Sequence, residues 1–197
     1  MLPRRFKQDL LAKQRLYCRF GNSYSMLQTI LADGTLANLL FRIQERLVDL
    51  RLPVLALIPH LVNKWLHGCV IGTRASFGGG LVLAHPIGIV INSSVRGGVN
   101  LVLESGVVIG DNRGRSPTLG DDIFVGSGAK IIGGVTVGSG ARIGANAVVV
   151  HDVAPGATVY GIPAREAPRR AAQRAAAVGD DHRDDYRVPA GAGTDDS

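Results

Sequence analysis

The sequence is poor in the residues that build disulfide frameworks, zinc sites and aromatic cores. Its 197 residues include two cysteines, one tryptophan and only 5% aromatic residues. The cysteines, Cys18 and Cys69, lie in different segments, and neither belongs to a CxxC pair. This pattern excludes a disulfide framework and a cysteine-based zinc module, so the fold must be held together by ordinary packing.

Long hydrophobic runs are also missing. The longest apolar tract, residues 52–66, contains two prolines, a histidine and a lysine, and it is too short to span a bilayer. The basic N-terminus is not followed by the apolar run of a secretory signal. We therefore expect a soluble, cytoplasmic protein.

Excess positive charge is confined to the first third of the chain. Residues 1–67 carry ten basic and four acidic side chains, residues 68–165 carry seven and five, and residues 166–197 carry five and seven. The basic residues form no dense block and have few aromatic neighbours, which argues against nucleic-acid binding. A solvated helical surface is the simplest interpretation, and peripheral contact with an anionic membrane surface is the alternative.

A six-residue period runs between residues 69 and 164. Counting in sixes from Ile71, thirteen of fourteen positions are aliphatic or Phe; the exception is Arg113, and the register resumes at Leu119. Neither an α-helix nor an alternating strand has this period, whereas a hexapeptide parallel β-helix does. We expect an all-β, left-handed parallel β-helix of about five coils, with glycine at its tight corners.

The flanking segments predict helices before the repeat and a polar tail after it. Asp33-Gly34-Thr35 marks one helix start. The predicted apolar stripes are Leu36, Leu39, Leu40, Ile43, Leu47 and Leu50, and then Val54, Leu57, Ile58, Leu61, Val62 and Trp65. We expect these stripes to cap the open first coil or to pack against a sister subunit. The expected domains are residues 1–67 (N-terminal helical segment), 68–165 (β-helix) and 166–197 (short helix and disordered tail).

Four passages within the repeat carry the signal for chemistry. They are Leu83-Ala-His85-Pro-Ile-Gly-Ile-Val-Ile-Asn92, Gly106-Val-Val-Ile-Gly-Asp-Asn-Arg-Gly114, Val125-Gly-Ser-Gly-Ala-Lys-Ile-Ile-Gly133 and Gly161-Ile-Pro-Ala-Arg165. Together they resemble the hexapeptide-repeat acyltransferases, most closely the serine acetyltransferase family and its exopolysaccharide branch, such as the colanic acid type. In that family the passages are the segment with the catalytic histidine, the loop leading to the acyl-CoA site, the wall along which pantetheine lies, and a closing motif.

The resemblance implies an acetyl-CoA-dependent O-acetyltransferase that works as a homotrimer, with active sites between adjacent β-helices and no metal. It makes His85 the general base, because an imidazole can take the proton of an attacking hydroxyl near neutral pH. A zinc site of the γ-class carbonic anhydrase type needs three converging histidines. Only His85 and His151 lie in the repeat, 66 residues apart, which argues against such a site.

Three polar positions of the serine site are changed in this chain. Val70 and Ala84 stand where the family has aspartates, one of which orients the histidine ring, and Ser116 stands where a serine-binding histidine precedes a proline. An amino-acid acceptor needs fixed partners for its ammonium and carboxylate groups. We therefore expect the acceptor to be a sugar hydroxyl in polysaccharide or glycoconjugate synthesis. L-serine is the alternative, and a catalytically weak trimeric scaffold is a second alternative.

The remaining candidates are assigned by chemistry and position. Glu104, Asn92 or a backbone carbonyl would orient His85, although Glu104 is equally explained as a solvated surface acid. In the loop 111–117, Arg113 and Arg115 would hold CoA phosphates or the acceptor, together with Ser116. The candidate CoA-binding residues are Gly110, Asp111, Ser127, Gly128, Ala145 and Arg165. The small residues among them are explained equally well by the needs of a coil corner.

Overall fold

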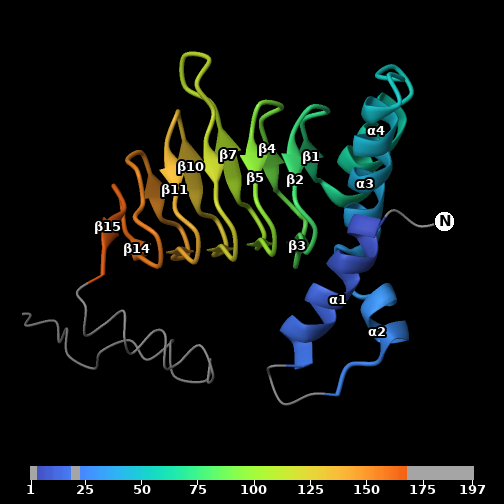
Figure 1. Cartoon of the computed structure of the whole chain (residues 1–197), viewed down its shortest axis with the longest axis horizontal. Helices are drawn as coiled ribbons and strands as arrows, with labels where there is room; N and C mark the ends of the chain where they lie inside the picture. Colours follow the sequence, from blue (N-terminus) through green and yellow to red (C-terminus); the bar gives the residue numbers. More distant parts are fainter. Residues whose placement is uncertain (1–3, 19–22, 168–197) are drawn as a thin grey trace, which may run out of the picture.

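The computed structural model describes residues 4–18 and 23–167, and within them four helices precede fifteen short strands (Figure 1). The helices are α1 (Arg4–Cys18), α2 (Met26–Leu31), α3 (Thr35–Asp49) and α4 (Leu57–His67). They gather at one end of a solenoid built from the strands. The expected helix after residue 165 begins instead as a strand, Arg165–Glu166, and residues 168–197 lie outside the described part.

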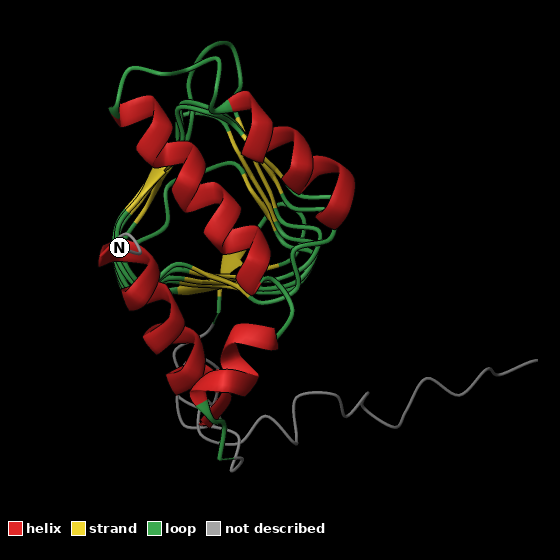
Figure 2. Ribbon diagram, turned by 90° about the vertical axis from the view of Figure 1, so that its right-hand side faces the viewer, coloured by secondary structure: helices red, strands yellow, loops and turns green. Residues whose placement is uncertain are grey.

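The strands stack into three parallel sheets around an apolar core, which confirms the prediction of a parallel β-helix (Figure 2). They are β1 (Val70–Ile71), β2 (Ser76–Phe77), β3 (Val82–Leu83), β4 (Val90–Ile91), β5 (Arg96–Gly97), β6 (Val102–Leu103), β7 (Val108–Gly110), β8 (Thr118–Leu119), β9 (Phe124–Val125), β10 (Lys130–Ile132), β11 (Thr136–Val137), β12 (Arg142–Ile143), β13 (Val148–Val149), β14 (Thr158–Tyr160) and β15 (Arg165–Glu166). The sheet orders are β1-β4-β7-β10-β13, β11-β8-β5-β2 and β15-β14-β12-β9-β6-β3. Among the strand pairs within residues 4–18 and 23–167, only β14–β15 at the far end is antiparallel.

The stacking register corrects the uninterrupted count in sixes. Ile71 pairs with Ile91 rather than with Ile89, because eight residues (91 − 83) separate the stacked Leu83 of β3 from Ile91 of β4. Ten residues (119 − 109) separate the stacked Ile109 of β7 from Leu119 of β8. The two insertions of two and four residues add up to one full six, so a simple count returns to phase and hides them.

The count looked regular because two positions in each six are buried. Residues two places before the stacked ones, such as Ile89, Leu101 and Val107, also point inward and are fully covered. Both insertions fall where the sequence places its candidate chemistry. The first contains the His85 corner, and the second is the loop 111–117.

Helix α3 covers the open first coil with a mixed face, on which Ala37 and Phe41 join the core between polar side chains. The prediction that its apolar stripe caps the coil is therefore wrong. Asn38 donates to the Leu81 carbonyl at 2.8 Å, Arg42 donates to the Phe77 carbonyl at 2.9 Å, and Glu45 accepts from the Phe77 amide at 3.2 Å. The first coil has no preceding coil to pair with, and these side chains satisfy its exposed backbone groups. Three residues of the stripe are exposed: Leu36, Ile43 and Leu50.

Helix α4 is also turned with apolar residues outward. Its buried residues are Pro59 and Asn63, whereas Ile58 and Trp65 are 61% and 80% exposed. Asn63 donates to the Ala37 carbonyl of α3 at 3.1 Å. The predicted second stripe therefore faces away from the coil. None of the described helices is long and apolar enough to cross a membrane.

A buried ion pair fixes α1 to α3 and to the first coil. Arg42 contacts both carboxylate oxygens of Asp9 at 2.7 and 3.0 Å, and Asp9 also accepts from the amides of Gly80 and Leu81 at 2.8 and 2.9 Å. Burial raises the pKa of Asp9, although the Arg42 guanidinium and these amides oppose the rise. Because every polar atom of this carboxylate is engaged, α1 is held in one position on the strand that leads to His85.

Candidate active site

His85 lies in the first insertion, at the corner between β3 and β4, and its side chain is 59% exposed. Its Nδ1 lies 3.5 Å from Oδ2 of Asp33, in the turn before α3. This separation suits an ion pair but is longer than a good hydrogen bond. Sequence reasoning used Asp33 only as a helix-start signal and missed it as a site residue, since neither the period nor a motif links it to His85.

The turn with Asp33 reaches His85 because Gly34 follows it. Gly34 has a φ of +75°, and a Cβ at this position would collide with the carbonyl oxygen of Leu83, two residues before His85. Only glycine permits both this backbone conformation and this approach. The ammonium group of Lys13 on α1 donates to the carbonyl of Asp33 and, at 3.4 Å, to that of Leu83. The turn and the strand are thus joined at the base of the His85–Asp33 pair.

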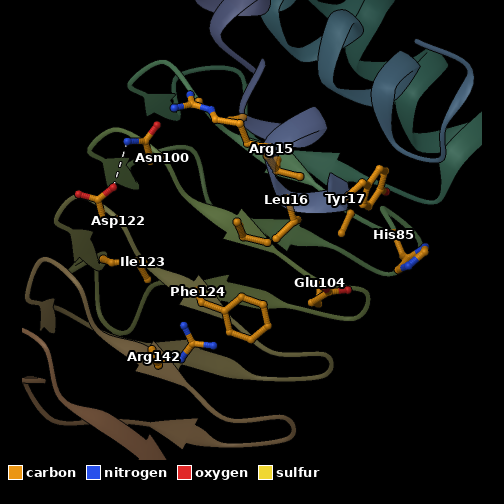
Figure 3. Close-up of a pocket in the computed structure, with 15 residues that line it drawn as sticks. Arg15, Leu16, Tyr17, His85, Asn100, Glu104, Asp122, Ile123, Phe124 and Arg142 are labelled. Atoms are coloured by element: carbon orange, nitrogen blue, oxygen red, sulfur yellow. Dashed lines mark hydrogen bonds between the residues drawn. The ribbon is translucent and has the colours of Figure 1, made fainter. Parts of the chain in front are cut away.

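A cavity of about 570 Å³ opens between α1 and the outer face of the β3-β6-β9-β12 sheet. Figure 3 shows His85, Glu104 and Tyr17 at one end of it and Arg15, Asn100 and Asp122 toward the other. The floor between them includes Phe124, whose ring has the Arg142 guanidinium carbon 5.1 Å from its centroid. The cavity therefore offers a candidate base at one end and charged or polar groups at the other.

The two predicted orienting residues are placed differently. Glu104 lines the same cavity as His85, so it remains a predicted second partner. Asn92 follows β4, where its side-chain oxygen accepts from the Ser94 amide at 2.9 Å and from the Ser116 hydroxyl at 3.3 Å. Its amide oxygen therefore organises the backbone beyond β4 rather than the imidazole.

On α1, Tyr17 is the residue near the carboxylates of Glu104 and Asp33. Burial raises the pKa of Tyr17, and Tyr24 and then the carboxylates of Glu104 and Asp33 raise it further. The phenol therefore stays protonated and able to donate a hydrogen bond in the cavity over the physiological range.

Three predicted CoA-binding residues, Ser127, Gly128 and Ala145, lie on the corner column that begins at His85. Successive corners are joined by the bonds of Gly106 N to Ile87 O at 2.9 Å, Gly128 N to Ser105 O at 2.7 Å and Asn146 N to Ser127 O at 2.8 Å. This column of small residues leads away from His85 along the solenoid, as a wall for an extended ligand would. Arg165 lies in β15, at the opposite end of the sheet from β3.

The loop 111–117 and the His85 corner lie at opposite ends of the strands of the β1-β4-β7-β10-β13 sheet. The His85 corner leads into β4, whereas this loop leaves from β7, beside Gly110, and forms a small hairpin (Figure 1). Arg113 and Gly114 have φ values of 52° and 76°, typical of a two-residue hairpin turn. Asp111 accepts from the Gly114 amide at 3.0 Å. Within one chain, the predicted arginines are therefore not brought to His85.

Arg115 instead lines a second cavity of about 360 Å³, which it shares with His151 and Asp152. Among residues 4–18 and 23–167, no three His, Cys, Asp or Glu side chains are grouped as metal ligands.

Comparison with known proteins identifies the family. Residues 116–151 match the family described as bacterial transferase hexapeptide (six repeats). The serine acetyltransferase of Bacillus subtilis (strain 168) is 35% identical over 164 residues, which cover 81% of this chain and 71% of that protein. The chain belongs to the serine acetyltransferase family. It is therefore an acyltransferase, as its motifs predicted.

Solved structures of this family share the fold beyond the repeat. The Neisseria gonorrhoeae serine acetyltransferase in complex with serine has a TM-score of 0.73 and 31% identity, and the match covers 81% of this chain and 68% of that one. A serine acetyltransferase in complex with CoA has a TM-score of 0.76 and 28% identity, covering 82% and 68%. The comparisons thus show the family, and these relatives are named serine acetyltransferases rather than exopolysaccharide acetyltransferases.

Proposed function

We propose that this protein is an L-serine O-acetyltransferase that uses acetyl-CoA, with His85 as general base and Asp33 as its orienting acid. The observation that carries the proposal is the pairing of Asp33 with His85, which lines the cavity, in a fold shared with relatives solved with serine and with CoA. The sequence left His85 without the family's ring-orienting carboxylate, because Val70 and Ala84 stand at the aspartate positions. Asp33 supplies such a carboxylate from a different element.

The chemistry is a single acyl transfer. The Nδ1–H of His85 points to Asp33, which leaves Nε2 free to take the proton of the serine hydroxyl as its oxygen attacks the thioester carbonyl. The new C–O bond forms, the C–S bond breaks, and the imidazolium returns its proton to the CoA thiolate. The column of Ser127, Gly128 and Ala145 would carry the pantetheine arm, because its small groups permit close approach.

The proposal includes a homotrimer. Arg113 and Arg115 follow the end of β7, whereas the His85 corner precedes the start of the neighbouring strand β4, so within one chain they lie at opposite ends of the same sheet's strands. Their predicted role in binding CoA or the acceptor therefore needs the hairpin of a neighbouring subunit. The apolar faces of α3 and α4 are a further surface available to a sister subunit.

A different hydroxyl acceptor is the second candidate, and one observation favours it. Ala84 and Ser116 still lack the side chains with which the family is expected to hold serine, and a cavity of about 570 Å³ is large for one serine. A sugar hydroxyl therefore serves as the competing arm of the test.

The test measures release of free CoA from acetyl-CoA by the purified full-length protein. We expect turnover with L-serine to exceed turnover with monosaccharides and oligosaccharides by at least about tenfold, which corresponds to about 1.4 kcal/mol. Greater turnover with a sugar than with L-serine would show that the acceptor is a sugar hydroxyl and not serine. CoA binding without turnover on any acceptor would instead favour the catalytically weak scaffold.

A further inference from the structure

Lys13 is a buried lysine on α1 that the acyl-transfer chemistry does not use. Its side chain is among the buried charged groups, with the residue only 3% exposed. The Nζ contacts two carbonyl oxygens from different elements, those of Asp33 and Leu83. The first belongs to the acid of the candidate pair, and the second precedes His85 by two residues. A buried charge is costly unless it is paired, so its retention at this place calls for an explanation.

The surroundings of Lys13 leave little freedom. One helical turn earlier, Asp9 ties the same face of α1 to the amides of Gly80 and Leu81. Gly34 packs directly on the same Leu83 carbonyl, and a Cβ there would lie 3.2 Å from Cδ of Pro86. The Lys13 ammonium bonds both the Asp33 and the Leu83 carbonyl oxygens, so it offsets the repulsion between these two partial negative charges with two charge-assisted bonds.

We propose that Lys13 is a positioning residue for acetyl transfer, whose ammonium joins the Asp33 turn to the His85 strand and so holds the carboxylate against the imidazole. The inference rests on the proposed role of His85 as base. It adds a residue that touches neither substrate nor imidazole and acts only through Asp33.

The charge on Lys13 depends on pH within an accessible range. Burial lowers the pKa of Lys13 from 10.5 to about 8, and the Asp33 carboxylate opposes this shift. The other groups that face it are Tyr17, whose ring centroid is 5.8 Å away, and, beyond it, Glu104 and His85 in the cavity. Above about pH 8 the ammonium becomes an amine, and its bonds to the carbonyls weaken.

The contribution of Lys13 to stability and the turnover of the enzyme should then respond to pH in opposite directions. Between about pH 8 and 10.5 the unfolded chain holds the Lys13 proton and the folded protein does not, so the contribution of Lys13 to stability rises with pH. Over the same range the positioning of Asp33 is lost and turnover falls. General unfolding at alkaline pH would lower both quantities together.

The experiment compares Lys13→Met, Lys13→Arg and Asp33→Asn with the exposed control Lys7→Met on the same helix. We expect Lys13→Met and Asp33→Asn to lower kcat about tenfold, a part of the about 10²–10⁴-fold that a general base contributes. The KM for acetyl-CoA should not change, and ¹⁵N NMR should show His85 losing its preference for the Nδ1–H tautomer. Lys13→Arg should restore kcat and remove the fall above pH 8, because guanidinium stays charged.

The outcomes separate the inference from the function on which it rests. Turnover retained in His85→Ala would overturn the proposed base. If His85→Ala is inactive while folded Lys13→Met keeps its kcat and its His85 tautomer, the positioning role alone is wrong. Should Lys13→Met fail to fold, Asp33→Asn decides, because that carboxylate is 79% exposed and its change does not disturb the core. An unchanged tautomer in Asp33→Asn also overturns the inference.

Discussion

The two insertions in the solenoid are built in different ways. The His85 corner is fixed from outside the repeat, by Gly34 against Leu83, by Lys13 between two carbonyls and by Asp33 opposite the imidazole. The hairpin 111–117 is held mainly by itself, through Asp111 to Gly114 and a pair of bonds between Asn112 and Arg115 at 2.9 and 3.1 Å. One insertion is therefore positioned within a single chain, whereas the other presents its arginines outward.

This difference separates two kinds of functional residue. A base must be held at a defined place relative to its orienting partner, which requires contacts from several elements. Phosphate-binding arginines on a hairpin need charge and reach, and they gain a fixed partner only when a ligand or a neighbouring subunit arrives. The predictions below test this division, and the largest expected effect comes first.

Replacing His85 by alanine should lower acetyl transfer by about 10²–10⁴-fold, the usual contribution of a general base. The imidazole is 59% exposed and supports no core contact, so unfolding temperature and CoA binding should stay unchanged. Steady-state release of CoA and calorimetric CoA titration measure the two quantities. Loss of CoA binding in the same variant would mean that His85 holds the donor instead.

Replacing Arg42 by methionine should destabilise the fold by about 3–5 kcal/mol, because it removes the cation that pairs with the buried carboxylate of Asp9 and leaves Arg5, 3.6 Å away, as the cation paired with Glu45. Urea unfolding measures this loss. We also expect the folded variant, at urea concentrations below its unfolding transition, to turn over more slowly than the unchanged protein, because α1 carries Lys13. The control is Arg46→Met, an exposed arginine on the same helix, which should change stability by less than about 0.5 kcal/mol. Equal stability of the two variants would contradict the capping role of Arg42.

Replacing Arg113 and Arg115 by alanine should raise the KM for acetyl-CoA about tenfold, the worth of one charge-assisted hydrogen bond, with little effect on unfolding temperature. Both side chains are exposed and only the backbone of the hairpin is internally bonded. Arg96→Ala, an exposed arginine outside the hairpin, is the matched control. An unchanged KM in both hairpin variants would leave the loop as a tolerated insertion.

For the helices, the sequence pattern predicted the secondary structure but not the face that contacts the coil. The apolar stripes correctly predicted that residues 35–49 and 57–67 are helical. They predicted the wrong contact face, because the end of a β-helix presents unpaired carbonyls and amides as well as apolar core. Asn38, Arg42 and Glu45 serve those groups, and the stripe of α3 is partly left outside. A hydrophobic pattern alone does not show that the backbone groups at the end of the coil need hydrogen-bond partners.

The six-residue period by itself determined that this chain is a parallel β-helix, because every coil repeats the same local need to bury two positions of each six against its neighbours. Only the tertiary structure decided the true register, with its two insertions, and only it placed Asp33 beside His85. The reason is physical: a period records contacts between successive coils, whereas the partner of His85 comes from a helix turn outside the repeat.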